Sequence, residues 1–234
     1  MSIYTIADLH LSFANSKPMD IFGENWKNHE QKIKDNWLKK VRNSDTVILP
    51  GDFSWATYIE DAKLDFEFIN SLPGKKILLK GNHDYWWTTL KSMREFLKNN
   101  NFNSIDFLYN NSYCIENKII VGTRGWMLQD NEENRKMINR ENERLKLSIN
   151  NAIENFGDDK EIIAFMHYPP LANQQLERNE HLEFYKTLKS NNIGKCYYGH
   201  LHGKSHNEAI EGDIYGVEFK LVSADYLDFD LVEV

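Results

Sequence analysis

The sequence is poor in cysteine and contains no long hydrophobic run. Its two cysteines, Cys114 and Cys196, lie far apart and form no ligand-like pair, so we expect a reducing, cytoplasmic setting with both as small buried apolar residues. No apolar run approaches the roughly 20 residues of a membrane span. The first residues also lack the basic and apolar regions of a signal peptide. These absences predict a soluble protein with no membrane partner.

An excess of positive charge is absent as well. The chain has 28 Lys and Arg against 35 Asp and Glu, a net charge of −7, so the protein as a whole repels polyanions. This disfavours nucleic acid as a partner, although a local cationic site could still exist. No repeat, low-complexity tract or linker divides the sequence. We therefore expect one globular domain over residues 1–234 and leave the oligomeric state open.

Short buried strands alternate with helical patterns in the first half of the chain. The strands are expected at residues 3–7, 46–49 and 76–79, and the helices at residues 26–41, 58–72 and 86–97. Such alternation implies right-handed crossovers and a largely parallel sheet.

Hairpins and helices mix in the second half. Strands are expected at residues 113–115, 118–121, 162–165, 195–198, 208–210 and 214–222, and helices at residues 131–156 and 177–188. Gly157 is a natural C-cap for the longer helix. The whole pattern suits an α/β fold with two stacked mixed sheets and helices outside.

Polar residues follow five of the predicted strands. They are Asp8-Leu9-His10, Gly51-Asp52, Gly81-Asn82-His83-Asp84, His167 and Gly199-His200-Leu201-His202. Ligands of open α/β sheets bind at the carboxyl ends of strands, so we expect these residues to converge. On an extended backbone, residues two apart point to the same side, so the D-x-H and H-x-H motifs would each offer two ligands to one cavity. The glycines let the backbone turn sharply or approach the site closely.

Seven of these residues are candidate metal ligands. They are Asp8, His10, Asp52, Asn82, His167, His200 and His202. Carboxylate and imidazole ligands suit Mn, Fe, Zn or Co, and the absence of thiolate argues against a structural zinc site. Seven ligands are too many for one catalytic metal, so we expect two divalent ions that share a carboxylate. With two aspartates and a bridging hydroxide, the formal charge of about +1 attracts a phosphate anion.

The ordered pattern D-x-H, G-D, G-N-H-D, H and G-H-x-H resembles the calcineurin-like metallophosphoesterases, and it spans Asp8 to His202. The resemblance implies a four-layer α/β/β/α sandwich. It also implies a dinuclear metal-dependent hydrolase that cleaves a small phosphomonoester or phosphodiester by attack of a metal-bridging hydroxide, with manganese among the possible metals.

The resemblance also assigns roles. One metal would be held by Asp8, His10, Asp52 and His202, and the other by Asp52 as the bridge with Asn82, His167 and His200. His83 would stabilise the transition state or protonate the leaving oxygen, and Asp84 would orient His83. No ligand position departs from the family pattern.

Other residues allow two interpretations. Arg124 suits bidentate phosphate recognition, but a surface salt bridge is equally compatible with its position. Several aromatic residues near the motifs are interpreted as core, with a pocket for an aromatic or nucleobase leaving group as the alternative; they are Trp55, Trp86, Trp87, Trp126 and Tyr168. We expect His29 and His181 to be solvated, His206 to be a strand residue, and residues 131–146 to form a solvated helix face.

Two other functions compete with the phosphoesterase. One is a metal-dependent scaffold that binds partners without hydrolysis, and the intact ligand set with His83 argues against it. The other is a nuclease on the same fold, which the net charge of −7 and the lack of a Lys/Arg stripe disfavour.

Overall fold

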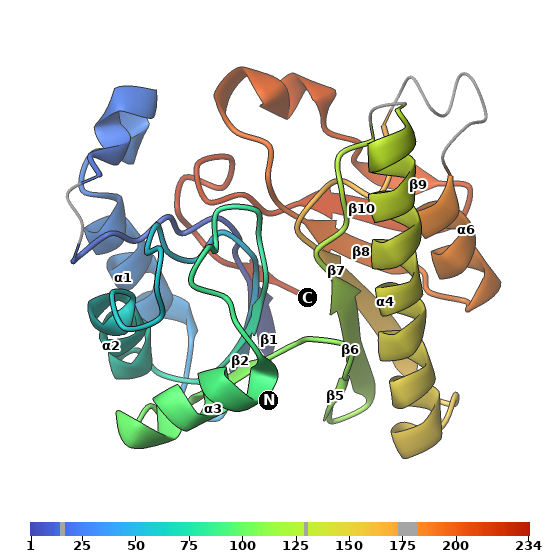
Figure 1. Cartoon of the computed structure of the whole chain (residues 1–234), viewed down its shortest axis with the longest axis horizontal. Helices are drawn as coiled ribbons and strands as arrows, with labels where there is room; N and C mark the ends of the chain where they lie inside the picture. Colours follow the sequence, from blue (N-terminus) through green and yellow to red (C-terminus); the bar gives the residue numbers. More distant parts are fainter. Residues whose placement is uncertain (15–16, 129–130, 173–181) are drawn as a thin grey trace.

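Two mixed β-sheets lie face to face at the centre of the protein, and helices cover their outer faces (Figure 1). The computed structural model describes residues 1–14, 17–128, 131–172 and 182–234. The architecture is the predicted α/β class, with the layer order helix, sheet, sheet, helix.

The first sheet has the strand order β11-β1-β2-β3-β4, with β1 to β4 parallel and β11 antiparallel to β1. Its strands are β1 (Ile3–Thr5), β2 (Thr46–Pro50), β3 (Lys75–Leu79), β4 (Ile105–Phe107) and β11 (Val232–Glu233). The accompanying helices are α1 (His29–Lys40), α2 (Lys63–Ser71) and α3 (Leu90–Asn99), with the 3-10 helices η1 (Met19–Phe22) and η2 (Glu24–Trp26) before α1.

The second sheet has the order β5-β6-β7-β8-β10-β9, in which β6, β7, β8 and β10 are parallel. Its strands are β5 (Tyr113–Ile115), β6 (Lys118–Thr123), β7 (Glu161–Met166), β8 (Lys195–Tyr198), β9 (Gly212–Ile214) and β10 (Val217–Leu221). Helices α4 (Glu132–Phe156) and α6 (Glu183–Ser190) cover it, and the 3-10 helix η3 (Gly203–Glu208) follows β8.

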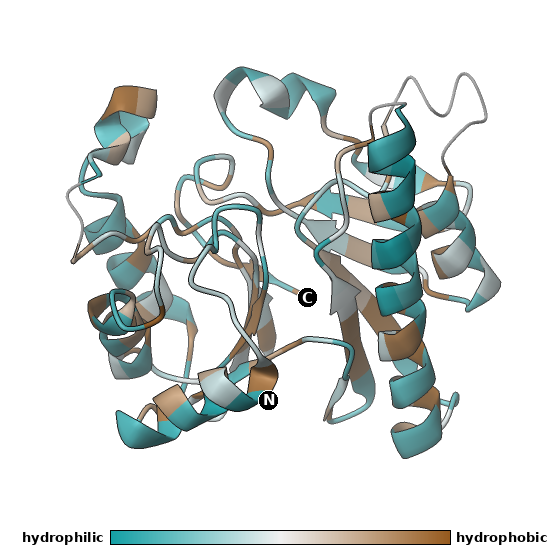
Figure 2. Cartoon of the chain, viewed as in Figure 1, coloured by the Kyte–Doolittle hydropathy of each residue, from teal (hydrophilic) through white to brown (hydrophobic). Residues whose placement is uncertain are grey.

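Three apolar clusters separate the four layers. Trp37 and Phe66 belong to the cluster between the first sheet and its helices, and Leu145 belongs to the corresponding cluster behind the second sheet. Between the sheets, Ile48 of β2 and Phe165 of β7 are both fully buried. Figure 2 shows the matching pattern, with hydrophilic residues on the outer sides of the helices and hydrophobic residues along the strands. Each large buried side chain stabilises the fold by about 1.5–3 kcal/mol.

Backbone hydrogen bonds between the segments that follow β1 and β10 join the two sheets. The N–H of Ala7 donates to the carbonyl of Val222 at 2.8 Å, and the N–H of Ala224 donates to the carbonyl of Ala7 at 3.0 Å. A parallel bridge pairs Ala7 with Ser223. The chain beyond β1 is therefore held against the chain beyond β10, just where Asp8 begins the first polar motif.

Helix α4 buries part of the stretch that was predicted to be a solvated face. Its C-cap is as predicted, since Gly157 follows its last residue with a φ of 78°. However, three polar residues of the stretch 131–146 are buried, namely Asn134, Glu141 and Asn142. Each of the three accepts a hydrogen bond that offsets the cost of its burial. The donors are Trp126 for Asn134, Thr123 of β6 for Glu141, and Thr187 of α6 for Asn142.

Several element boundaries also differ from the sequence prediction. Helix α2 begins at Lys63 rather than at residue 58, and the edge strands β4 and β11 were not predicted. The last hairpin turns at Tyr215 and Gly216, where both φ values are positive (48° and 85°), as a tight two-residue hairpin requires; residues 208–210 therefore do not form its first strand. Residues 177–181 of the predicted helix at 177–188 lie outside the described residues.

Candidate metal centre

All seven predicted ligands lie on loops that leave the carboxyl ends of strands. Asp8 and His10 follow β1, Asp52 follows β2 and Asn82 follows β3. From the second sheet, His167 follows β7, whereas His200 and His202 follow β8. The chain segments beyond β1 and β10 pair at Ala7 and Ser223, so these loops meet at one end of the molecule (Figure 1).

The backbone at four of the ligands is not extended, contrary to the expectation from the D-x-H and H-x-H spacing, whereas His202 is extended with a φ of −129°. Four ligands have left-handed backbone conformations, with φ of 61° at Asp8, 47° at His10, 50° at Asp52 and 74° at His200. This conformation is uncommon for residues with a side chain and costs free energy. The two ligands of the D-x-H motif are therefore brought together by sharp turns, whereas the H-x-H motif combines a turn at His200 with an extended His202.

Glycines allow the ligand loops to approach each other closely, as predicted. A Cβ atom at Gly81 would overlap the carboxylate and the backbone nitrogen of Asp52, and one at Gly199 would overlap the carboxylate of Asp8. A Cβ atom at Gly51, whose φ is 91°, would lie 2.7 Å from Nδ1 of His167. Any larger residue at these positions would displace a candidate ligand.

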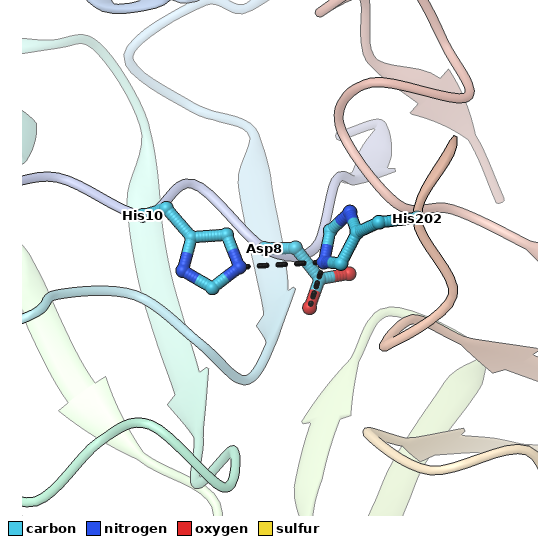
Figure 3. A group of neighbouring side chains, drawn as sticks. All are labelled: Asp8, His10 and His202. Atoms are coloured by element: carbon cyan, nitrogen blue, oxygen red, sulfur yellow. Dashed lines mark hydrogen bonds and ion pairs between the residues drawn. The ribbon is translucent and has the colours of Figure 1, made fainter. Parts of the chain in front are cut away.

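One group of ligand atoms is formed by Asp8, His10 and His202, whose donor atoms lie within 4.8 Å of one another. Figure 3 shows the two imidazoles facing each other above the Asp8 carboxylate. The Nε2 atoms of His10 and His202 are 3.3 Å apart, and Nε2 of His202 is 3.8 Å from Oδ1 of Asp8. The facing nitrogens and the carboxylate oxygen are the donor set expected of a divalent-ion site.

A second group is formed by Asp8, Asp52 and His167. Nε2 of His167 lies 2.6 Å from Oδ1 of Asn82 and 3.6 Å from Oδ2 of Asp52. The same Oδ2 of Asp52 is 3.8 Å from Nε2 of His10. Asp52 thus lies between the two groups of nitrogen ligands.

His200 approaches the second group from the opposite loop. Its imidazole packs edge-on against that of His167, with ring centroids 5.1 Å apart. Its backbone N–H donates to Oδ2 of Asp8 at 2.9 Å. All seven predicted ligands are therefore gathered in one place.

The electrostatics of the group favour cations. Burial raises the pKa of Asp8 to about 8 and also raises the pKa of Asp52. Burial lowers the pKa of His10, and it lowers the pKa values of His167 and His200 to about 3. Oδ1 of Asp8 is buried and accepts no hydrogen bond from the described residues. Neutral imidazoles and unsatisfied carboxylates are what bound divalent ions stabilise, so these residues fit a metal centre.

Asp225 is a residue of this site that was not predicted. Oδ1 of Asp225 accepts a hydrogen bond from Nδ1 of His202 at 2.8 Å, which directs Nε2 of His202 toward Asp8. Oδ2 of Asp225 lies 3.3 Å from Nε2 of His206. His206 itself lies in η3 rather than in a strand, contrary to the prediction. Asp225 could have been suspected because it also follows a strand, β10, at the same edge.

Burial would lower the pKa of His202, but the hydrogen bond that His202 donates to Asp225 and the charge of Asp8 outweigh it and raise that pKa to about 9. Hydrogen bonding to a carboxylate also fixes the orientation of a ligand imidazole and increases its basicity.

Asp84 supports the backbone of the site instead of orienting His83. Its carboxylate accepts five hydrogen bonds. The donors are the backbone N–H groups of Asp52, Phe53, Ser54 and Gly81 and the indole N–H of Trp86, at distances from 2.7 to 3.2 Å. Nδ1 of His83 is buried and has no hydrogen-bond partner among the described residues. Asp84 therefore holds together the loops that carry Asp52 and Asn82.

His83 lies at the edge of the ligand group. Its backbone N–H donates to Oδ1 of Asp52 at 2.8 Å. Its ring packs against Trp55 at a centroid distance of 4.4 Å and lies 5.8 Å from the ring of His10. Trp55 also stacks on His10 at 4.8 Å, so this tryptophan contacts the site and is not simply part of the core.

The remaining predicted residues have mixed outcomes. Trp86, Trp87 and Tyr168 are buried, in agreement with the prediction of core positions, and Tyr168 also packs on His200 at a centroid distance of 4.1 Å. Arg124 lies over the ring of Trp126 at 4.4 Å, and its Nη2 atom is 3.6 Å from Glu141, so it forms an inward ion pair rather than a surface one.

Two smaller predictions about burial were wrong. His29 is buried, because its ring packs edge-on against Trp26, 5.3 Å away, where the first helix meets the site loops. Cys114 is only half-buried, on the edge strand β5, whereas Cys196 in the central strand β8 is buried as predicted. His181 lies outside the described residues.

The sequence pattern of the calcineurin-like phosphoesterases matches residues 1–204, so the chain belongs to this family. It is accordingly a hydrolase of phosphate esters, and the clustered Asp and His side chains are those of a metal-binding site. No curated protein gives a significant match. Among the described residues, no helix combines the length and the apolar character required to cross a membrane.

Solved structures with the same fold include a hydrolase. The phosphopantetheinyl hydrolase of Mycobacterium tuberculosis has 16% sequence identity and a TM-score of 0.57, over 100% of this chain and 95% of the other. A protein of unknown function from Aquifex aeolicus has 19% identity and a TM-score of 0.53, over 99% and 95%. A protein from Thermus thermophilus has 14% identity and a TM-score of 0.53, over 86% and 82%. At these identities the similarity establishes the fold alone.

Proposed function

We propose that the protein is a dinuclear metal-dependent phosphohydrolase that acts on a small phosphomonoester or phosphodiester. The observation that carries the proposal is the position of Asp52, whose Oδ2 atom lies 3.8 Å from Nε2 of His10 and 3.6 Å from Nε2 of His167. A carboxylate between two sets of nitrogen ligands is suited to bridge two cations.

The ligands divide between two sites in this proposal. The first site comprises Asp8, His10, Asp52 and His202. The second comprises Asp52, Asn82, His167 and His200. Two bound divalent ions supply a water of lowered pKa and neutralise the charge that develops on the phosphoryl oxygens. The donor set suits Mn, Fe, Zn or Co, with manganese as the first metal to test.

The protein's own residues position the substrate and assist departure of the leaving group. His83 is assigned to the leaving oxygen, to which it donates a hydrogen bond or a proton. This assignment is supported by the position of its ring beside His10 and Trp55. Asp84 acts through the backbone, because its hydrogen bonds hold the loops of Asp52 and Gly81 together. Arg124 is assigned to substrate binding near the second site, since its carbonyl accepts the N–H of His167.

The proposal extends to the organisation and location of the protein. We propose one domain over residues 1–234, supported by the hydrogen bonds that join the two sheets at Ala7. A cytoplasmic location is supported by two free thiols, Cys114 and Cys196. A nuclease or a non-catalytic scaffold on the same fold remains the alternative, and the experiment below separates them.

The decisive experiment is a panel of phosphate esters assayed after chelation and reloading with Mn, Mg, Zn or Co. We expect chelation to abolish hydrolysis and one or more metals to restore it. His83→Ala should keep the metal content of the wild type and lose about 10²–10⁴-fold in turnover on unactivated esters, whereas Asp52→Asn should lose metal and turnover together. Full activity of His83→Ala on several unactivated esters would remove the proposed role of His83. A metal-loaded protein that cleaves no ester would favour the scaffold, and cleavage of oligonucleotides alone would favour the nuclease.

A further inference from the structure

A pocket with a cavity volume of about 260 Å³ opens beside the loops that carry the candidate metal ligands. It lies between the ends of β3 and β6, the loop after β4, and helix α4. Its charged lining residues are Lys80, Arg124, Arg140, Glu141 and Arg144. Four cations and one carboxylate give this pocket a formal charge of +3, in a chain whose net charge is −7.

The carboxylate of Glu141 neutralises only part of this charge. Its Oε1 atom is 3.6 Å from Nη2 of Arg124 and 3.5 Å from Nε of Arg144, and its Oε2 atom accepts the hydroxyl hydrogen of Thr123 at 2.8 Å. Among the described residues, none forms an ion pair with Lys80 or Arg140. The pocket is therefore strongly electropositive without a ligand.

Two of the three guanidinium groups, those of Arg124 and Arg144, are held in place before any ligand binds. Arg124 lies over the ring of Trp126 at 4.4 Å, and Arg144 lies over the ring of Tyr109 at 4.7 Å. Nε of Arg124 is buried and has no hydrogen-bond partner among the described residues. An anion would satisfy this buried donor and reduce the repulsion among the neighbouring cations.

The pocket shares its backbone with the metal-ligand loops. The carbonyl of Arg124 accepts the N–H groups of His167 at 3.2 Å and of Tyr168 at 2.9 Å. Lys80 directly precedes Gly81 and Asn82. A substrate whose scissile phosphate reaches His167 and Asn82 therefore has the basic pocket beside it.

We propose that this basic pocket binds a second phosphate group of the substrate, so that the preferred esters carry a phosphate besides the one that is cleaved. The proposal rests on the function proposed above. A formal charge of +3 matches a phosphate dianion better than a singly charged carboxylate, and three guanidinium forks match the oxygens of a phosphate group.

The test uses the metal-loaded full chain and ligands that it cannot hydrolyse. Calorimetry would compare propylphosphonate with α,ω-alkane bisphosphonates of two to six carbons, for the wild type and for Arg140→Gln and Arg144→Gln. We expect the best bisphosphonate to bind the wild type with an affinity at least about tenfold higher than that of the monophosphonate. The reason is that one charge-assisted hydrogen bond raises the affinity by about tenfold or more. In each variant, the ratio of bisphosphonate affinity to propylphosphonate affinity should fall by a factor of about three to ten, while the affinity for propylphosphonate itself stays the same.

Lys146→Gln is the matched control, since it removes one positive charge from the exposed side of the same helix, α4. It should keep the preference for the bisphosphonate. Equal affinities of wild type for both ligands, or equal losses in the control and the pocket variants, would overturn the proposal. Arg140 is exposed, so Arg140→Gln tests the pocket even if Arg144→Gln fails to fold. Because phosphonate binding needs no turnover, the result is independent of whether the protein hydrolyses the esters proposed above.

Discussion

Replacing Gly81 with alanine tests whether the metal centre depends on the close approach of two ligand loops. The added Cβ atom would overlap the backbone nitrogen of Asp52 and lie 2.8 Å from its carboxyl carbon. The φ angle of Gly81 lies outside the left-handed region, so alanine is compatible with the backbone conformation there. The substitution therefore isolates the steric contact with Asp52 from any effect of backbone strain.

The expected size of the effect follows from two opposing terms. Overpacking against backbone costs about 1–3 kcal/mol, whereas alanine gains about 0.4–1 kcal/mol because it restricts the unfolded chain. The net loss of about 1–2 kcal/mol should lower the melting temperature by about 2–8 °C in a chain of this size. Activity should suffer more, because a displacement of about 1 Å in a catalytic group costs about 100-fold in rate.

Gly194→Ala provides the control, because its Cβ atom would meet nothing within 4 Å and its φ is also outside the left-handed region. This variant should be as stable as the wild type or slightly more stable, with unchanged kcat/KM and metal content. The assays are kcat/KM on a phosphate ester, metal stoichiometry after dialysis, and thermal unfolding. Wild-type metal content and kcat/KM in Gly81→Ala would refute the argument that Asp52 has no room to move.

Three further predictions follow from buried polar groups. Asp84→Asn leaves at least two of five donors without an acceptor, so urea unfolding should show a loss of about 3 kcal/mol or more; an unchanged midpoint would contradict this. Burial lowers the pKa of Lys76 from 10.5 to about 8, so the unfolded chain binds more protons and stability should rise by about 1 kcal/mol per pH unit between pH 8 and pH 10; Lys76→Met should remove this slope in denaturation series. Asp225→Asn should weaken metal binding about 10–100-fold in metal titrations, because His202 loses its orienting carboxylate; equal affinity would argue against that role.

The parts of the fold that the sequence predicts well are those with strong local patterns. Helix α4 was expected at residues 131–156 and observed at Glu132–Phe156, with Asn131 and Gly157 as its caps. The central strand β2 was expected from its run of apolar residues and is buried along its whole length. By contrast, β11 has only two residues and pairs with β1 from the far end of the chain. Such an edge strand is defined by its partner, so no local pattern reveals it.

The ligand residues could be predicted from the sequence, but their geometry and support could not. The spacing of Asp8 and His10 suggested an extended backbone, yet both residues have positive φ. The N–H groups of Asp8 and His10 donate to the carbonyls of Gly51 and Asp52, at 3.0 Å each, and these long-range bonds select the turned conformation. Asp225 escaped prediction for the same reason, because its role depends on contact with His202 across 23 positions in sequence.

The strained backbone at the ligands explains why residues that touch no substrate should matter for catalysis. A left-handed conformation at Asp8, His10, Asp52 or His200 costs of order 1 kcal/mol or more and persists only where surrounding contacts fix it. Asp84 supplies such contacts to the Asp52 loop, and Oδ2 of Asp8 supplies one to His200. Since the loops fix one another, a change in any one of them should shift ligands on the others. The positions of the candidate ligands are therefore set before metal binds. This lowers the free-energy cost of ordering the site when metal and substrate bind.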